Sequence, residues 1–125
     1  DFSGVRFPRN GSKGRVFELR TYYVTPGKLP NLLERFRNHT CKLFEEYGMT
    51  NLWYWTVVDA YPVEETLVYF LSHPSQQAGL KAFNDFRNDP EWVKVRQDSE
   101  DKAGGSLTVK VESVYLKSLD FSPIR

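Results

Sequence analysis

Three polar side chains with complementary chemistry alternate along the segment Val16–Val24: Glu18, Arg20 and Tyr22. The segment is rich in β-branched and aromatic residues, which predicts a β-strand. Because successive side chains on a strand point to opposite faces, these three should project to one side. The other side of this predicted strand would face the core, through Phe17, Leu19 and Tyr23.

The chemistry open to this trio is the recognition of an anionic or carbonyl-bearing ligand. Arg20 would orient such a ligand through charge-assisted hydrogen bonds, and Tyr22 would donate a further one. The alternative is a structural ion pair between Glu18 and Arg20, or a solvated contact at an interface. Inside a closed cavity the two charges must pair with each other or bind something. We therefore take all three as candidate ligand-binding residues lining a cavity.

A second candidate site is aromatic. The run Leu52–Val58 places Trp53 and Trp55 on one face of a predicted strand, and Phe70 on the next strand would join them if Leu67 and Leu71 face the helices. These rings could form a stacking wall for a planar ligand. Packing in the core or at a dimer interface is the alternative, since aromatic neighbours on strands commonly pair.

Nucleophiles and metal ligands are sparse. His39 and His73 could each serve as a general base or a haem ligand, because imidazole titrates near neutral pH. Neither has a further His or Cys at ligand spacing, so no zinc or iron site is expected. We expect a surface or capping role for both, with His73, just before Pro74, pointing to solvent. Cys41 has no recognisable base, so we assign no catalytic residue.

Composition narrows the class of protein. The 125 residues carry 17 basic and 16 acidic side chains, a net charge of +1, and one cysteine. This balance is unlike the basic footprint of a nucleic-acid-binding protein or a polybasic membrane anchor. No apolar run approaches the roughly 20 residues that span a bilayer, which predicts a soluble protein. A lone cysteine does not indicate a compartment, and a start at Asp1 rather than Met is either a cloning boundary or a processing site.

The elements that position these residues follow in a clear order. Residues 1–14 are rich in glycine, which predicts a lead-in segment whose apolar residues Phe2, Val5 and Phe7 could dock on the rest of the protein. One domain over residues 15–125 follows it. An apolar stripe from Leu29 to Tyr47 predicts a helix of about five turns that ends at Gly48. Two strands, Leu52–Val58 and Thr66–Leu71, then form a hairpin around Tyr61 and Pro62.

The second half of the chain predicts two helices and a strand. One helix should begin at Pro74 and carry Leu80, Phe83 and Phe86 on one side, and a short one should begin at Asp89-Pro90-Glu91 and end at Ala103-Gly104-Gly105. A last strand follows from Leu107. The resulting βαββαβ order predicts an α+β, ferredoxin-like domain with a four-stranded sheet. RNA-recognition domains share this order, but Glu65–Phe70 lacks the basic residue and glycine of their RNA-binding strand.

Both strands of the hairpin are apolar on both faces, whereas an antiparallel sheet in a small monomer keeps one face wet. Something must cover the second face. We expect a second copy of the chain, because a monomer would expose a larger apolar patch than soluble monomers tolerate.

Three stretches together resemble the NIPSNAP family: Glu18–Tyr22 followed by Pro26-Gly27-Lys28, the helix start Asp89–Trp92, and the ending Leu119–Pro123. The resemblance covers residues 16 to 123. It implies a dimeric α/β barrel, in which two ferredoxin-like sheets with helices on one face close around a central space. It brings no established catalytic residues, but the wider superfamily includes cofactor-independent monooxygenases and haem enzymes.

The sequence therefore predicts a homodimeric NIPSNAP-like domain that binds a small ligand or a partner in or near the barrel cavity. The alternative is a small oxygenase that works without a cofactor or with haem. We expect no cofactor and no nucleic acid for the ligand-binding homodimer, and haem only for the oxygenase.

Overall fold

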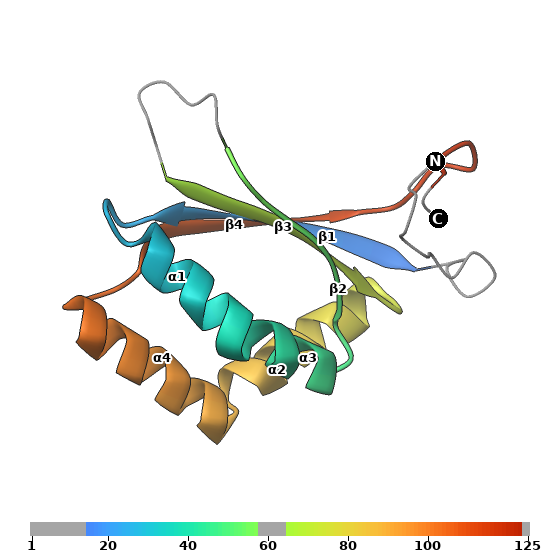
Figure 1. The fold of residues 1–125 in the computed structure, drawn as a ribbon. Coiled ribbons are helices and arrows are strands. Elements are labelled where there is room, and N and C mark those ends of the chain that lie inside the picture. Colours follow the sequence, from blue (N-terminus) through green and yellow to red (C-terminus); the bar gives the residue numbers. More distant parts are fainter. Residues whose placement is uncertain (1–14, 58–64, 124–125) are drawn as a thin grey trace.

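The computed structural model describes residues 15–57 and 65–123 of the chain (Figure 1). The expected lead-in over residues 1–14 and the turn at Tyr61 and Pro62 lie outside these ranges. Four strands form one antiparallel sheet in the order β2-β3-β1-β4. The strands are β1 (Val16–Val24), β2 (Thr50–Thr56), β3 (Thr66–His73) and β4 (Thr108–Leu116). This is the topology of a ferredoxin-like domain, as predicted.

The first helical segment follows its predicted extent but is not uniform. It consists of α1 (Leu29–Arg35), a π-helical turn (Phe36–Thr40) and α2 (Cys41–Glu46), with helical backbone angles at both junctions. In the π turn the hydroxyl of Thr40 donates to the carbonyl of Arg35 at 3.3 Å, five residues earlier. Gly48 then has φ +82°, a left-handed conformation that glycine adopts without strain, and the helix ends there as expected.

Two more helices complete the layer on one side of the sheet (Figure 1). The first, α3 (Gln76–Arg87), is capped by Ser75, whose hydroxyl accepts from the backbone of Ala78. Pro74 therefore precedes this helix, and its predicted place as the first helical residue was wrong. The second, α4 (Pro90–Ala103), begins at the predicted Asp89 cap. Its end lies at Gly104, also as predicted.

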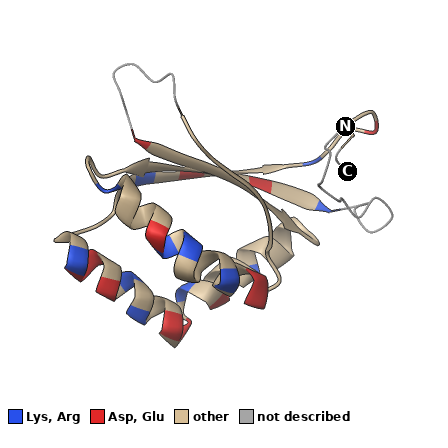
Figure 2. Ribbon diagram, in the orientation of Figure 1, with Lys and Arg blue, Asp and Glu red and all other residues tan. Residues whose placement is uncertain are grey.

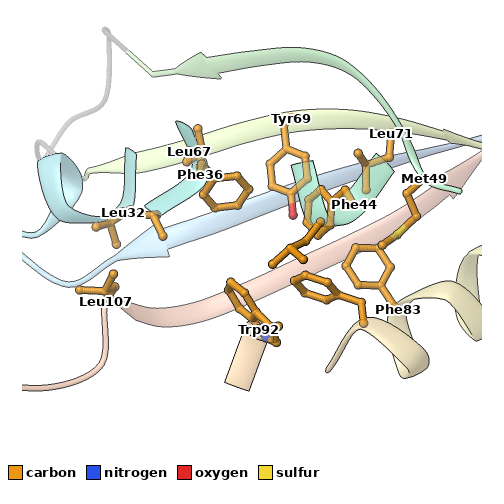
Figure 3. Close-up of a cluster of buried hydrophobic side chains, with 13 residues drawn as sticks. Leu32, Phe36, Phe44, Met49, Leu67, Tyr69, Leu71, Phe83, Trp92 and Leu107 are labelled. Carbon is orange, nitrogen blue, oxygen red and sulfur yellow. The ribbon is translucent and has the colours of Figure 1, made fainter. Parts of the chain in front are cut away.

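The core fills the space between the sheet and the helices. Tyr69 lies at its centre with none of its surface exposed, stacked on Tyr54 at 4.9 Å and on Phe44 at 6.0 Å between ring centroids. Around it pack buried side chains from the other elements, which Figure 3 shows, among them Leu32, Phe36, Met49, Leu67, Leu71, Phe83, Trp92 and Leu107. Many of the aromatic side chains of the chain therefore belong to the core.

Figure 2 shows that the charged residues lie mainly on the helices. Several form ion pairs one turn apart, such as Lys81 with Asp85 and Lys94 with Asp98. Such exposed pairs contribute little to stability. None of the helices in the described part of the chain is long and apolar enough to cross a membrane.

Helix α3 approaches the sheet most closely at Gly79. A Cβ atom at this position would lie 2.8 Å from Cδ2 of His73, 2.9 Å from its Cγ and 3.0 Å from the hydroxyl of Tyr115. Carbon atoms do not pack at such distances, so only glycine fits without movement of the histidine ring. This contact fixes how near the helix lies to β3 and β4.

We predict that Gly79→Ala lowers the free energy of unfolding by about 1 to 3 kcal/mol, the range for overpacked cores. In an exposed helix the same change would raise it by up to about 1 kcal/mol, so the sign is diagnostic. Urea denaturation of the wild type and the variant measures the change in the free energy of unfolding. Leu80→Ala is the control, because Leu80 is the next residue of the helix and is 55% exposed. A Gly79→Ala protein as stable as the wild type would contradict the close approach.

Candidate functional site

A buried polar cluster lies on the helix side of the sheet, centred on Glu18, which is 1% exposed. Its Oε1 lies 2.7 Å from Nε2 of His73, and its Oε2 accepts from Nη1 of Arg20 at 2.9 Å and from the hydroxyl of Ser113. These partners come from β3, β1 and β4. One carboxylate thereby joins three adjacent strands, and we call these residues, with Tyr22 and Tyr69, the Glu18 cluster.

The strand register explains why these side chains meet. Arg20 lies opposite Tyr69 of β3 and Ser113 of β4, and Glu18 lies opposite Leu71. Tyr69, Leu71 and His73 alternate on β3, so His73 reaches the helix side two residues beyond the partner of Glu18. Sheet geometry alone therefore brings five residues together under α3: Glu18, Arg20, Tyr69, His73 and Ser113.

Arg20 is the second centre of the cluster and is 7% exposed. Its Nε donates to the hydroxyl of Tyr69 at 2.9 Å, and that hydroxyl donates to Tyr22 at 3.0 Å. The guanidinium also lies over the ring of Phe83, 4.1 Å from its centroid. The candidates Glu18, Arg20 and Tyr22 thus lie on one face of the sheet, as predicted, where Glu18 and Arg20 form a hydrogen-bonded ion pair and Tyr22 is linked to Arg20 through Tyr69.

Burial and hydrogen bonding act in opposite directions on the ionisation of Glu18. Burial by itself would raise the pKa of Glu18, but the hydrogen bonds from His73 and Ser113 and the charge of Arg20 outweigh burial, so its pKa lies below the ordinary value. Burial raises the pKa of Tyr69 well above its ordinary value. Glu18 therefore stays ionised and Tyr69 stays protonated at neutral pH.

His73 was expected to point to solvent, and this is wrong: none of its surface is exposed. The strand β3 extends through His73 rather than ending at Leu71, so the alternation of its inward residues continues. That continuing alternation was the sequence signal that could have placed it. An Nε2–H that donates to Glu18 leaves Nδ1 as an acceptor, and Nδ1 has no hydrogen-bond partner within the described residues.

The aromatic candidates lie on the opposite face of the sheet. Trp53 and Trp55 stack with ring centroids 5.8 Å apart, and Phe70 meets both edge-on at 6.5 and 5.9 Å. Leu67 and Leu71 face the helices, as this grouping required. We call the side that bears these rings the open face, because no helix of Figure 1 covers it.

The two groups of candidates therefore do not line one cavity. Arg20 pairs across the sheet with Tyr69, and Leu19 pairs with Phe70, so β1 shows its polar trio to the helices and its apolar residues to the open face. The predicted orientation of β1, with Phe17, Leu19 and Tyr23 toward the core, is the reverse of the observed one. A role in ligand binding stays a prediction for both groups.

The remaining candidates are separate from both sites. His39 is exposed on the π turn, in line with the expected surface position. Cys41 is half-buried, and burial raises the pKa of its thiol. No group of three or more His, Cys, Asp or Glu side chains that could hold a metal ion occurs in residues 15–57 and 65–123.

The sheet order and the single helical layer define a ferredoxin-like α+β domain with a buried ionic centre. Within that class, the NIPSNAP family model matches residues 17–123, so the chain belongs to the NIPSNAP family. No curated protein sequence matches the chain.

Solved structures agree with the family and the fold. A NIPSNAP family protein of unknown function from Agrobacterium tumefaciens superposes with a TM-score of 0.74 at 19% identity, over 89% of this chain and 94% of that one. A NIPSNAP domain protein from Burkholderia xenovorans gives 0.70 at 20% identity, over 86% and 98%. SnoaB, a cofactor-independent oxygenase from Streptomyces nogalater, shares the fold at 0.57 and 12% identity, over 88% and 98%.

We predict strong coupling between Glu18 and Arg20. Arg20→Leu leaves a buried carboxylate without its cation, so it should lower the free energy of unfolding by about 3 kcal/mol. The double variant Glu18→Leu with Arg20→Leu should lose at least about 1 kcal/mol less than the sum of the single losses. Urea denaturation of all four proteins measures the cycle. Additive losses would show that the two charges act independently.

The lowered pKa of Glu18 also predicts an acid-dependent contribution to stability. Because the folded state binds this proton less tightly than the unfolded state, the contribution is present above the unfolded pKa, about 4.3 for Glu, and is lost as pH falls through the lower folded pKa. Glu18→Gln should therefore flatten the fall in unfolding free energy over this acid range. Glu46→Gln, which changes an exposed carboxylate, is the control. Two equal profiles would contradict the argument.

Proposed function

We propose that this NIPSNAP-family chain functions as a homodimer that binds a small planar or apolar molecule against its open face. The observation that carries the proposal is the aromatic wall of Trp53, Trp55 and Phe70, which stands on the face of the sheet away from the helices. An interaction site is the usual reason for a contiguous exposed apolar patch in a protein.

The open face is apolar beyond these three rings. Trp55 is 47% exposed, Val114 52% and Leu116 38%, and Leu19 lies between Phe70 and Val114 across the sheet. The two charges that β4 adds to this face, Lys110 and Glu112, pair with each other at 3.7 Å. A patch of this kind is self-complementary, which suits the isologous contact of a two-fold dimer. A second copy would enclose the rings between two sheets.

Two valines provide a matched test of the dimer. Val114 on the open face and Val93 on α4 are each 52% exposed, so a lysine at either site costs the free monomer little. We expect the wild type to be a dimer at micromolar concentration by light scattering and sedimentation. Val114→Lys should weaken association at least about tenfold, which is about 1.4 kcal/mol, whereas Val93→Lys should not change it. A monomeric wild type, or equal effects of the two changes, would contradict the proposal.

Ligand binding is tested separately with a fluorescent planar probe, 1-anilinonaphthalene-8-sulfonate. Its emission should rise with saturation on the wild-type protein. Trp55→Ala and Phe70→Ala should each weaken binding several-fold by removing stacking area. Val93→Ala is the control for a change outside the open face. If none of these changes affects binding, the probe binds elsewhere, which would contradict the ligand part of the proposal. The dimer part has its own test.

A second candidate function is suggested by the pair formed by Glu18 and His73, together with the fold shared with an oxygenase. A carboxylate that orients an imidazole is a common arrangement for a general base. The ring of His73, however, is enclosed by Glu18, Gly79, Phe83 and Tyr115, and its Nε2 is already bonded. The other ring nitrogen, Nδ1, has no hydrogen-bond partner within the described residues but is buried, so His73 does not present an imidazole nitrogen to a haem iron.

We predict that the protein does not accelerate the oxidation of naphthohydroquinone by O2, which yields naphthoquinone and hydrogen peroxide. The rate with wild type should equal the rate with His73→Gln and the rate without protein. Absorbance of the quinone measures it. Acceleration by the wild type that His73→Gln abolishes would favour the enzyme over the binding module.

A further inference from the structure

A cleft of about 370 Å³ lies between the first helical segment and α4, on the outer side of the helical layer. Figure 1 shows α1 and α4 running alongside each other, with α1 nearer to the sheet. Its walls include Arg35 from α1, Asn38 and His39 from the π turn, and Val95 and Ser99 from α4. The volume is within the range of small-molecule sites. Neither the open face nor the Glu18 cluster contributes to it.

Arg35 is the unusual residue of this cleft. Its side chain packs with Cζ 5.0 Å from the centroid of the Trp92 ring, and its Nη1 donates to the hydroxyl of Ser99 at 3.2 Å. Only 8% of the residue is exposed, yet its Nε has no hydrogen-bond partner among the described residues. Burial lowers the pKa of Arg35, which reflects the cost of keeping a charge there.

Arg20 has a directly bonded carboxylate, which Arg35 lacks in the described part of the chain. Arg20 is 7% exposed and has the carboxylate of Glu18 at 2.9 Å, whereas Arg35, equally buried, forms none of the ion pairs found within the described ranges. Two lysines of the cleft already have partners, since Lys94 pairs with Asp98 and Lys102 with Glu34. The carboxylate of Glu100 acts on Arg35 only from a distance. A buried guanidinium without a directly bonded anion is costly, and an anion from solution would lower that cost.

The π turn is a second observation at the same place. It directly follows Arg35 and carries Asn38 and His39, two exposed polar side chains, on the wall of the cleft. Turns of this type are rare and occur frequently at functional sites. The dimer and its ligand on the open face do not account for it.

We propose that this cleft binds a small molecule through one oxyanion group, a carboxylate or a phosphate, that lies against the guanidinium of Arg35. Arg35 supplies the charge and a planar set of donors, which matches an oxyanion. Asn38, His39 and Ser99 offer polar contacts, and Val95 offers an apolar one. The carboxylates of Glu34, Glu91 and Asp98 also line the cleft, so a ligand with one anionic group fits better than a polyphosphate.

The Nε–H groups of the two buried arginines give a direct test by proton–nitrogen correlation spectroscopy of the wild-type protein. Inorganic phosphate and propionate are the probes, with chloride at equal ionic strength as the blank. Either probe should shift the Arg35 signal, assigned with Arg35→Lys, in a saturable way. The Arg20 signal, from a group bonded to Tyr69, should not move. A shift with phosphate alone or propionate alone identifies the kind of oxyanion. No saturable shift with either, or equal shifts of both arginines, would overturn the proposal.

A substitution that supplies the anion within the chain completes the test. Ser99→Asp places a carboxylate where the Ser99 hydroxyl meets Arg35, so it should raise the melting temperature and weaken probe binding at least about tenfold. Gln97→Asp makes the same charge change on the same helix outside the cleft, and should do neither. Unchanged binding in Ser99→Asp would show that the probe does not bind at Arg35 and would overturn the proposal.

Discussion

The carboxylate of Glu18 is the constraint on which the rest of this sheet depends. It is held under the helices by groups from β1, β3 and β4, and its charge is matched by that of Arg20. Removing water from such a pair is unfavourable, and the pair is stable only because every oxygen of the carboxylate is bonded. The arrangement is therefore sensitive to strand register, since a shift by one residue would turn Glu18 to the other face and leave its partners unpaired.

That centre also explains the close packing around it. Gly79 has no side chain because the ring of His73, fixed by Glu18, occupies the space above β3. Phe83 from the same helix lies over the guanidinium of Arg20. The polar centre and the aromatic core are thus a single packed unit rather than a site set into a core. This favours a supporting role for the cluster and leaves the open face and the outer cleft as the surfaces available to other molecules.

The sequence allowed much of the fold to be predicted, because its signals are local. The Asp89 cap, the glycines at positions 48 and 104 and the apolar stripe of the first helix all lie within a few residues of the ends that they determine. The orientation of β1 could not be predicted in the same way. Alternation separates its residues into two sets, but the choice of the buried set depends on His73 and Ser113, 55 and 95 residues away from Glu18. Apolar residues ordinarily form the core set of a strand, and a buried ion pair is the exception to that rule. No local signal marks the π turn.

The edge strand β2 differs from the other three strands in how it is attached. The Glu18 cluster does not include it. Side chains at its start, such as Asn51, bond instead to Cys41 and Glu45 of α2. Hydrogen exchange would therefore divide the sheet into two cooperative units: amides of β1 would open only with global unfolding, whereas β2 would open at lower free energy. The strand that carries both tryptophans of the aromatic wall is then also the one that can open without breaking the Glu18 cluster.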